Sequence, residues 1–381
     1  MPVAQSKTSM REIVLFFLRL GLSGFGGPAA HIALMERDAV ERRGWLTREQ
    51  FLDLVGGCNL LPGPGSTQVA MALGYTRRKW RGLAIAGTCF ILPAALSTLA
   101  LAWAYVRFGH LPQAQGLLYG AKPVMVAIVV QAIWRLGHMA LRRWTLALLG
   151  VACLGAAVAG APPIAVLLVA GAIELLVVWQ RSRQKAAHGI AWFSAGLGGA
   201  ATGLAGTAGL LSIALTFLKL GIVVFGSGYV LLAFLKADLV DRLHWISDQQ
   251  LLDAVTAGQI TPGPLFATAT FLGYLLRGWA GAAVATVAIF LPSFFMAAAV
   301  GAFAGRIRAS KGAAAFLDGV NAAAVALMAQ MAFVLGRAAL IDTWTWGLGI
   351  VSAALLLRFR VNATWVIACG ATLGVLLHLF R

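Results

Sequence analysis

Eight apolar runs, each close to the length that crosses a bilayer, divide this chain and limit it to a multi-pass membrane fold. A helix of about 20 apolar residues spans the hydrocarbon core. The runs lie at 82–106, 115–134, 144–161, 162–180, 280–304, 314–335, 343–357 and 361–380. Only 11% of the 381 residues are charged, whereas a soluble domain carries roughly a quarter. Soluble enzymes and secreted disulfide-rich domains are therefore excluded.

The net charge of +17 does not indicate a nucleic-acid partner. The basic residues stand in short clusters between apolar runs, which is typical of the positive-inside pattern of membrane proteins. The four cysteines stand alone in apolar segments and lack metal-ligand spacing. We therefore expect a lipid-embedded protein with no cofactor, no metal site and no enzymatic activity.

The chain consists of two homologous halves. Residues 17–65 align without gaps with residues 217–265, at a constant offset of 200. With one deletion the match continues as far as Gly120 and Gly319. Chance does not produce such a match, so it indicates an internal repeat. We predict a first repeat, a basic cytoplasmic linker with an unpaired helix, and a second repeat, at residues 1–180, 181–210 and 211–381.

The basic loops change sides between the halves. In the first half, every second loop between apolar runs is basic, at Arg77–Arg81 and at Arg142–Arg143. In the second half they stand at the alternate connections, as Arg306, Arg308, Lys311, Arg358 and Arg360. The positive-inside rule then predicts an all-α inverted-topology repeat with about 13 hydrophobic segments. The apolar run 189–210 supplies the odd crossing, which places the N-terminus in the cytoplasm and the C-terminus outside.

Each half opens with two interrupted apolar runs, at 12–35 and 48–76 and again at 212–235 and 248–275. Thr47 and Ser247 begin capping boxes, so a helix starts at each. That helix must end before the Pro-Gly-Pro sequence, after about 14 residues or roughly 21 Å, which does not span a bilayer. The sequence leaves open whether these are kinked full spans or re-entrant hairpins.

The breaks predict an anion site near mid-membrane. Broken backbone at this depth survives where it is buried in protein or lines a wet cavity, and each half-helix N-terminus attracts anions. Intramembrane cations are usually functional. We therefore expect substrate contacts at Arg19, Ser23, Gly26, Gly27, Asn59, Pro62, Gly63, Pro64, Ser66, Thr67, Lys122, Lys219, Gly226 and Gly263. The alternatives are snorkelling of Arg19, an interfacial Lys122, and small-residue packing for the hydroxyls.

Four ionisable residues are candidates for coupling transport to protons. Asp53 and Asp253 lie about one turn into the capped half-helices, where they could equally stabilise the helix or form an ion pair. Glu36 lies near a membrane end and is replaced by Lys236 in the second half. His31 could titrate near neutral pH, although a hydrogen-bonded structural histidine is the simpler interpretation.

The combined motifs resemble one family of transporters. They are Phe17-Leu-Arg-Leu-Gly-x3-Phe25-Gly-Gly-Pro28-x2-His31, the stretch ending at Trp45, and Leu61-Pro-Gly-Pro-Gly-Ser-Thr-Gln68. The chain is similar to the chromate ion transporter family in its long, two-domain form. The second half departs from the pattern, reading Phe225-Gly226-Ser227-Gly228.

The resemblance implies a bacterial inner-membrane carrier that exports chromate, driven by the proton-motive force. The partners it implies are chromate and protons, with sulfate as a second anion. The sequence itself leaves the oligomeric state open, with a homodimer as one option. Chromate and sulfate are both tetrahedral dianions, so the residues do not separate them. A sulfate or other oxyanion permease and an anion channel remain as alternatives.

Overall fold

The computed structural model describes residues 8–25, 27–109, 111–183, 208–225, 228–307, 311–359 and 361–379. Helices make up most of these ranges and no strand occurs in them, so the predicted all-α class is confirmed for the described residues. Large apolar side chains such as Trp144 (75% exposed) and Trp365 (70%) cover the outer helical surface. An exposed apolar surface of this extent is expected of a protein surrounded by lipid.

The same order of helices occurs twice. The first half contains α1 (Met10–Ser23), α2 (Gly27–Met35), α3 (Arg48–Asn59), α4 (Gly65–Phe108), α5 (Pro112–Ala140), α6 (Trp144–Val158) and α7 (Pro163–Arg183). The second contains α8 (Leu210–Val223), α9 (Leu231–Leu235), α10 (Asp248–Ile260), α11 (Thr268–Ile307), α12 (Lys311–Ala339), α13 (Thr343–Leu357) and α14 (Ala363–Leu379). In the described ranges, α4, α5, α7, α11 and α12 are long and apolar enough to cross a membrane.

The longest helix of each half is a hairpin. In α4 the backbone leaves helical geometry at Arg78 and Lys79, whose φ is +50°. The chain turns back there, so the backbones of Gly74 and Gly82 touch. We call residues 65–77 the short arm of α4 and residues 80–108 its long arm. In α11 the same turn occurs at Gly278, with φ +58°.

Both interrupted runs of the first half are re-entrant hairpins. The Arg77 guanidinium, at the end of the short arm of α4, donates to the Thr8 hydroxyl (Nε to Oγ1, 2.9 Å) and to the Trp45 carbonyl (3.0 Å). The start of α1, the segment before α3 and the end of this arm therefore lie at one end of the molecule. Each interrupted run returns to the end of the molecule from which it started. The runs are therefore hairpins and not kinked full spans.

The second half repeats this arrangement. The Arg277 guanidinium donates to the Ala208 carbonyl just before α8 (2.8 Å). Four hairpin turns result, which we call tips: the α1–α2 tip around Gly24, the α3–α4 tip around Gly63, the α8–α9 tip around Val224 and the α10–α11 tip around Gly263. Both predicted capping boxes are present and start α3 and α10.

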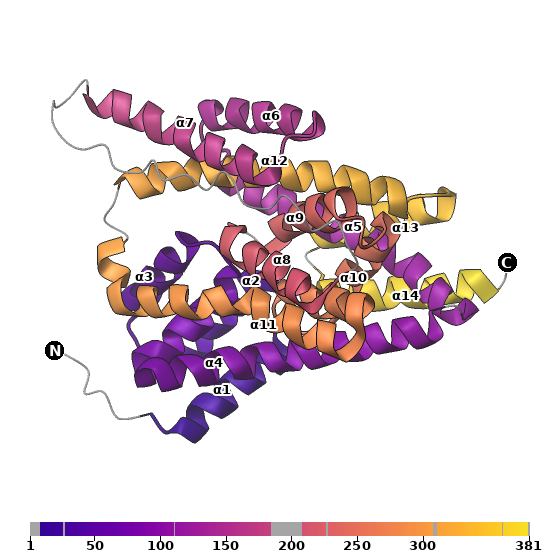
Figure 1. Cartoon of the computed structure of the whole chain (residues 1–381), viewed down its shortest axis with the longest axis horizontal. Helices are drawn as coiled ribbons and strands as arrows, with labels where there is room; N and C mark the ends of the chain where they lie inside the picture. Colours follow the sequence, from indigo (N-terminus) through magenta and orange to yellow (C-terminus); the bar gives the residue numbers. More distant parts are fainter. Residues whose placement is uncertain are drawn as a thin grey trace.

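The two halves exchange their last helices. The pair α13 and α14 packs on α5, while α6 and α7 pack on α12, and α4 lies beside α11 (Figure 1). Matching side-chain amides join the exchanged parts, from Gln131 to the Leu356 carbonyl and from Gln330 to the Ala157 carbonyl, both at 2.8 Å. The halves therefore form one intertwined bundle with the tips inside it.

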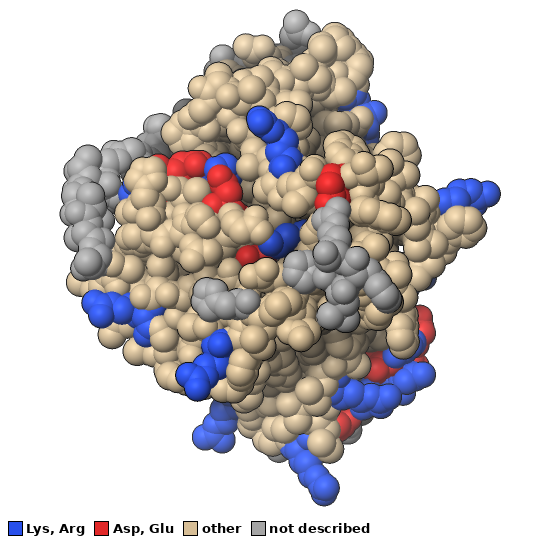
Figure 2. Space-filling view, turned by 90° about the vertical axis from the view of Figure 1, so that its right-hand side faces the viewer, with Lys and Arg blue, Asp and Glu red and all other residues tan. Residues whose placement is uncertain are grey.

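The predicted spans agree closely with the helices, and three predictions fall outside the described residues. Gly26 and Gly226 do, and so does nearly all of the unpaired run 189–210. Figure 2 shows the end of the molecule toward which α14 runs. Separate Lys and Arg side chains and a few acidic ones stand there on a mostly uncharged surface.

Candidate anion pathway between the tips

The tips of the two halves bind each other through their backbones. The Gly63 N–H donates to the Val224 carbonyl at 2.6 Å, and the Gly263 N–H donates to the Gly24 carbonyl at 2.8 Å. These two bonds join corresponding residues, offset by 200. Backbone groups freed by a broken helix must find partners when they are buried. Here each half supplies the partners of the other.

Glycine is required at the two Pro-Gly-Pro tips. Gly63 and Gly263 adopt φ values of +114° and +101°, which side chains other than glycine's rarely tolerate. A Cβ atom on Gly263 would lie 2.7 Å from the Ala94 Cβ of α4. One on Gly63 would lie 3.1 Å from the Ser293 Oγ of α11. The tips therefore pack against the long arms of the opposite half without room for a side chain.

Unpaired polar oxygens surround the α3–α4 tip. Thr67 Oγ1, Gln68 Oε1 and Ser293 Oγ are buried, and among the described residues they have no hydrogen-bond partner. The Gln68 amide nitrogen, by contrast, donates to the Pro62 carbonyl. An unsatisfied buried polar group costs about 1–3 kcal/mol, so such a group usually serves a ligand, a water or a functional role. A site for a small polar species is consistent with this cluster.

His31 joins two tips. Its ring is fully buried, with Nε2 2.9 Å from the Gly24 carbonyl and Nδ1 3.2 Å from the Ser66 hydroxyl. It fixes the α1–α2 tip against the first turn of α4. The structure thus shows His31 hydrogen-bonded between the breaks.

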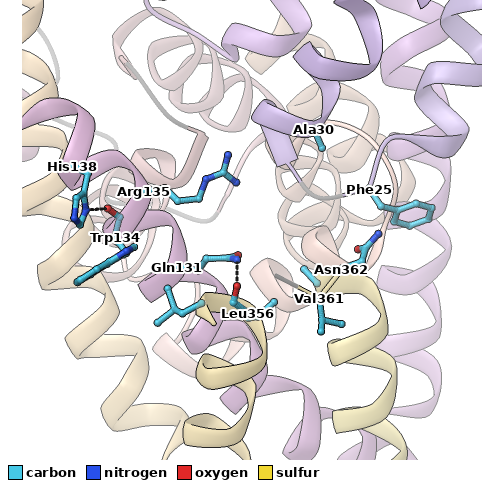
Figure 3. Close-up of a pocket in the computed structure, with 11 residues that line it drawn as sticks. Phe25, Ala30, Gln131, Trp134, Arg135, His138, Leu356, Val361 and Asn362 are labelled. Atoms are coloured by element: carbon cyan, nitrogen blue, oxygen red, sulfur yellow. Dashed lines mark hydrogen bonds between the residues drawn. The ribbon is translucent and has the colours of Figure 1, made fainter. Parts of the chain in front are cut away.

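A cavity of about 720 Å³ opens beside the α1–α2 tip (Figure 3). This volume lies in the range of small-ligand sites. Arg135 extends into it from α5, opposite Phe25 and Ala30 of the tip. The remaining lining residues are Gln131, Trp134, His138, Leu356, Leu357, Val361, Asn362 and Ala363. The cavity therefore combines one cation with aromatic, apolar and amide groups. We call it the wide cavity.

A second, narrow pocket lies at the meeting point of the tips. Its accessible volume is about 10 Å³, roughly enough for one water molecule. Its lining includes Gly24, Pro28 and Gly263, with Thr261 and Gln259 from the second half. The α1–α2 hairpin contributes residues to both spaces, Phe25 and Ala30 to the wide cavity and Gly24, Gly27 and Pro28 to the narrow pocket.

Tyr229 of the second half also lines the narrow pocket. We call the two spaces together the route, with the Arg135 guanidinium at its wide end and the Gln259 and Thr261 side chains at its narrow end. Such a route favours a small anion.

Two of the predicted cations lie away from this route. Arg19 is exposed on the outer face of α1, beside Leu15 and Leu22, which are each 56% exposed. The Ser23 hydroxyl donates to the Arg19 carbonyl at 2.8 Å and is exposed too. Lys219 binds Asp238 through its ammonium at 2.6 Å. Neither cation lines the described pockets.

Lys122 and Asp253 bind each other. Their Nζ and Oδ1 atoms are 2.8 Å apart, with side chains 11% and 3% exposed. The Tyr105 hydroxyl donates to the other carboxylate oxygen at 2.9 Å. The sequence predicts separate roles for these two residues, as an anion ligand and as a coupling group. The structure joins them as one buried ion pair between the halves, which is the pairing that the sequence leaves open for Asp253.

The comparison with known proteins shows the family. The sequence profile of the chromate transporter family matches residues 11–175 and 211–375, once in each half. The chain belongs to the chromate transporter family. Its helices and its relatives make it a multi-pass membrane transporter.

Several relatives match along most of their length. A chromate transport protein of Cupriavidus metallidurans is 35% identical over 380 residues, covering 96% of this chain and 92% of that protein. One of Pseudomonas aeruginosa is 31% identical, with the same coverage. An uncharacterized transporter of Bacillus subtilis is 34% identical over 130 residues, which are 34% of this chain and 73% of that protein. No solved structure gives a significant match.

The other predicted residues of this chromate-transporter-family chain have mixed positions. Gly27 lines the narrow pocket, while Pro62 and Pro64 flank Gly63 in the α3–α4 tip. Asn59 is exposed at the end of α3. Asp53 is half-buried on α3, and Glu36 binds Arg48 at 3.0 Å at the end of the molecule where α1 begins.

Sequence reasoning missed Arg135, the cation of the wide cavity. The apolar run 115–134 ends just before Arg135, so the sequence indicates only a charged residue at the end of a membrane span. Its counterpart is Val334, and a search for cations shared by both halves therefore passes over it. The sequence pattern that could have indicated Arg135 is its helical spacing from Gln131 and His138. This spacing places the three polar side chains on the same face of α5.

Proposed function

We propose that this protein is a secondary-active carrier that exports chromate from the bacterial cytoplasm across the inner membrane, coupled to the proton-motive force. The relatives that it matches along nearly its whole length are named chromate transport proteins. The observation that carries the proposal is the route formed by the wide cavity with Arg135 and the four hydrogen-bonded tips. Chromate is a tetrahedral dianion that such a route can attract and hold.

The chemistry at the route suits a dianion at both ends. Arg135 supplies a guanidinium, whose fork of N–H donors matches two oxygens of an oxyanion. At the tips, the first turn of α4 offers a helix N-terminus with the Ser66 and Thr67 hydroxyls. The dipole and free N–H groups there stabilise negative charge in a water-poor interior. We propose that the anion moves from Arg135 to these donors.

Alternating access follows from the relation between the halves. In Figure 1 the long arms of α4 and α11 run in opposite directions, which supports an inverted-topology repeat. Such repeats typically place the substrate between them and move against each other. The end where α1 begins carries the Arg77–Arg81 cluster, which favours the cytoplasm for it. The wide cavity, at the C-terminal part of α5, then opens toward the cytoplasm.

The test is chromate flux into everted membrane vesicles with an imposed pH gradient. We compare the wild type with Arg135→Gln, and Arg19→Gln is the matched control because it removes the same charge from the outer face of α1. Losing a hydrogen bond to a charged group costs about 1.5–3 kcal/mol, or roughly 10-fold or more in rate. We expect that loss for Arg135→Gln alone, at equal amounts of protein in the membrane.

The other outcomes separate the alternatives. Sulfate competing with chromate indicates a shared dianion site. Sulfate flux without chromate flux refutes chromate as the substrate and leaves an oxyanion permease. Flux that ignores the gradient refutes coupling and favours a channel. Equal losses in both variants refute the role of Arg135.

A further inference from the structure

A buried cluster joins the two repeats at a position separate from the wide cavity. Lys122 comes from α5 and Tyr105 from α4, both in the first half, while Asp253 comes from α10 in the second. The carboxylate binds the ammonium at 2.8 Å and accepts the hydroxyl hydrogen bond at 2.9 Å. The Asp253 side chain is only 3% exposed. Three helices from the two halves are therefore connected through one carboxylate.

The cluster lies beyond the tips, on the side away from the wide cavity. On α5, Lys122 precedes Arg135 by 13 residues, which is about 20 Å along the helix. On α10, Asp253 precedes Gln259 of the narrow pocket by six residues, or about 9 Å. The Thr98 and Thr261 hydroxyls, 3.2 Å apart, join α4 to the α10–α11 tip between these levels. The order along the bundle is thus Arg135, the tips and then the cluster.

The second repeat has a different residue at each partner position. Asp53 corresponds to Asp253, but Asn321 stands in place of Lys122 and Ala304 in place of Tyr105. Lys122 and Tyr105 therefore hold the Asp253 carboxylate on one side of the tips, and the second half has no equivalent ammonium and phenol at the matching positions. This asymmetry matches the opening of the wide cavity on the other side.

We propose that Lys122, Asp253 and Tyr105 form a latch that closes the route on the side of the tips opposite the wide cavity. Replacing a buried ion pair by apolar residues is often neutral or stabilising, so such a pair is weak evidence for stability. An ion pair that bridges two moving repeats can instead be formed in one arrangement of the repeats and broken in the other. When α10 separates from α4 and α5, the ion pair between Lys122 and Asp253 breaks. The transported anion then binds Lys122 and replaces the negative charge of Asp253. This last step rests on the proposed function, whereas closure itself does not.

The test measures access to the narrow pocket from the face at which α4 ends. Thr261 lines that pocket, so we introduce Thr261→Cys after replacing Cys58, Cys89, Cys153 and Cys369. A membrane-impermeant maleimide is added from that face in sealed vesicles. We expect slow labelling with the latch intact and at least five-fold faster labelling after Lys122→Gln. The charge-swapped pair Lys122→Asp/Asp253→Lys restores slow labelling.

A matched control removes a different ion pair between the repeats. Arg143 binds the buried Glu174 at 3.2 Å and Asp318 of the second half at 2.9 Å, away from the described pockets. Arg143→Gln should leave the labelling slow. Equal acceleration in Arg143→Gln indicates general loosening and overturns the latch. Unchanged labelling in Lys122→Gln, with normal labelling from the opposite face, also overturns it.

Transport is measured separately on the same vesicles. Faster labelling in Lys122→Gln without chromate flux in the wild type supports the latch and refutes the proposed substrate. Chromate flux in the wild type together with unchanged labelling refutes the latch and leaves the proposed function intact.

Discussion

The tip glycine Gly263 gives the sharpest test of the structure. Replacing it with alanine imposes two costs. Its φ of +101° is unfavourable for any residue with a Cβ atom, which costs about 1–3 kcal/mol. The new Cβ also lies 2.7 Å from the Ala94 Cβ, and overpacking of this kind costs roughly 1–3 kcal/mol more. We expect Gly263→Ala to destabilise the protein by about 2–6 kcal/mol.

Gly160 is the matched control, because it separates strain from contact. It also has a positive φ, +89°, but a Cβ atom there would meet nothing within 4 Å. Gly160→Ala should therefore cost only the strain, about 1–3 kcal/mol. The double variant Gly263→Ala/Ala94→Gly removes the close contact and keeps the strain, so it should fall to the level of the control.

The assay is thermal unfolding of the purified protein in detergent, followed by chromate flux in vesicles. We expect the order of stability to be wild type, then Gly160→Ala with the double variant, then Gly263→Ala. Flux should be lost in Gly263→Ala, because the shifted tip breaks its hydrogen bond to Gly24, and retained in Gly160→Ala. If Ala94→Gly gives no recovery, or if Gly160→Ala is as damaging as Gly263→Ala, the packing argument for the tip is refuted.

Two further predictions use matched pairs within the chain. Gln131→Ala and Gln330→Ala each remove one hydrogen bond between the halves, so each should lower the free energy of unfolding by about 1 kcal/mol. Gln131→Ala alone should also reduce chromate flux, because Gln131 lines the wide cavity. Equal flux in the two variants would contradict this. His31→Ala leaves two buried oxygens without their partner and should cost about 1–3 kcal/mol for each, whereas His138→Ala, on the exposed rim, should change stability by less than about 0.5 kcal/mol. A similar loss in both histidine variants would show that His31 does not join the tips.

The helices could be predicted because their signals are local. Length and hydropathy locate the spans, and the capping boxes at Thr47 and Ser247 mark the starts of α3 and α10 within one residue. The breaks at Gly63 and Gly263 follow from proline and glycine chemistry. Even the offset of 200 identifies which residues of the two halves correspond.

The arrangement of the candidate site could not be predicted, because its members meet across the halves. The tips were expected to lie near mid-membrane, but their exchange of hydrogen bonds depends on how two repeats interlock. Intramembrane charge alone could not distinguish Arg19, which faces outward, from Arg135, which faces the wide cavity. Nor could it show that Lys122 and Asp253 neutralise each other.

The sequence by itself therefore determined a helical membrane transporter made of two related halves with paired breaks. Those properties depend on neighbouring residues and on a repeat that can be read directly. Only the tertiary structure decided that the interrupted runs turn back, that α13 and α14 pack on α5, and that Arg135 rather than Arg19 faces the route. The reason is physical: which face of a helix is buried depends on the partner it packs against, and here that partner lies about 200 residues away in the other half.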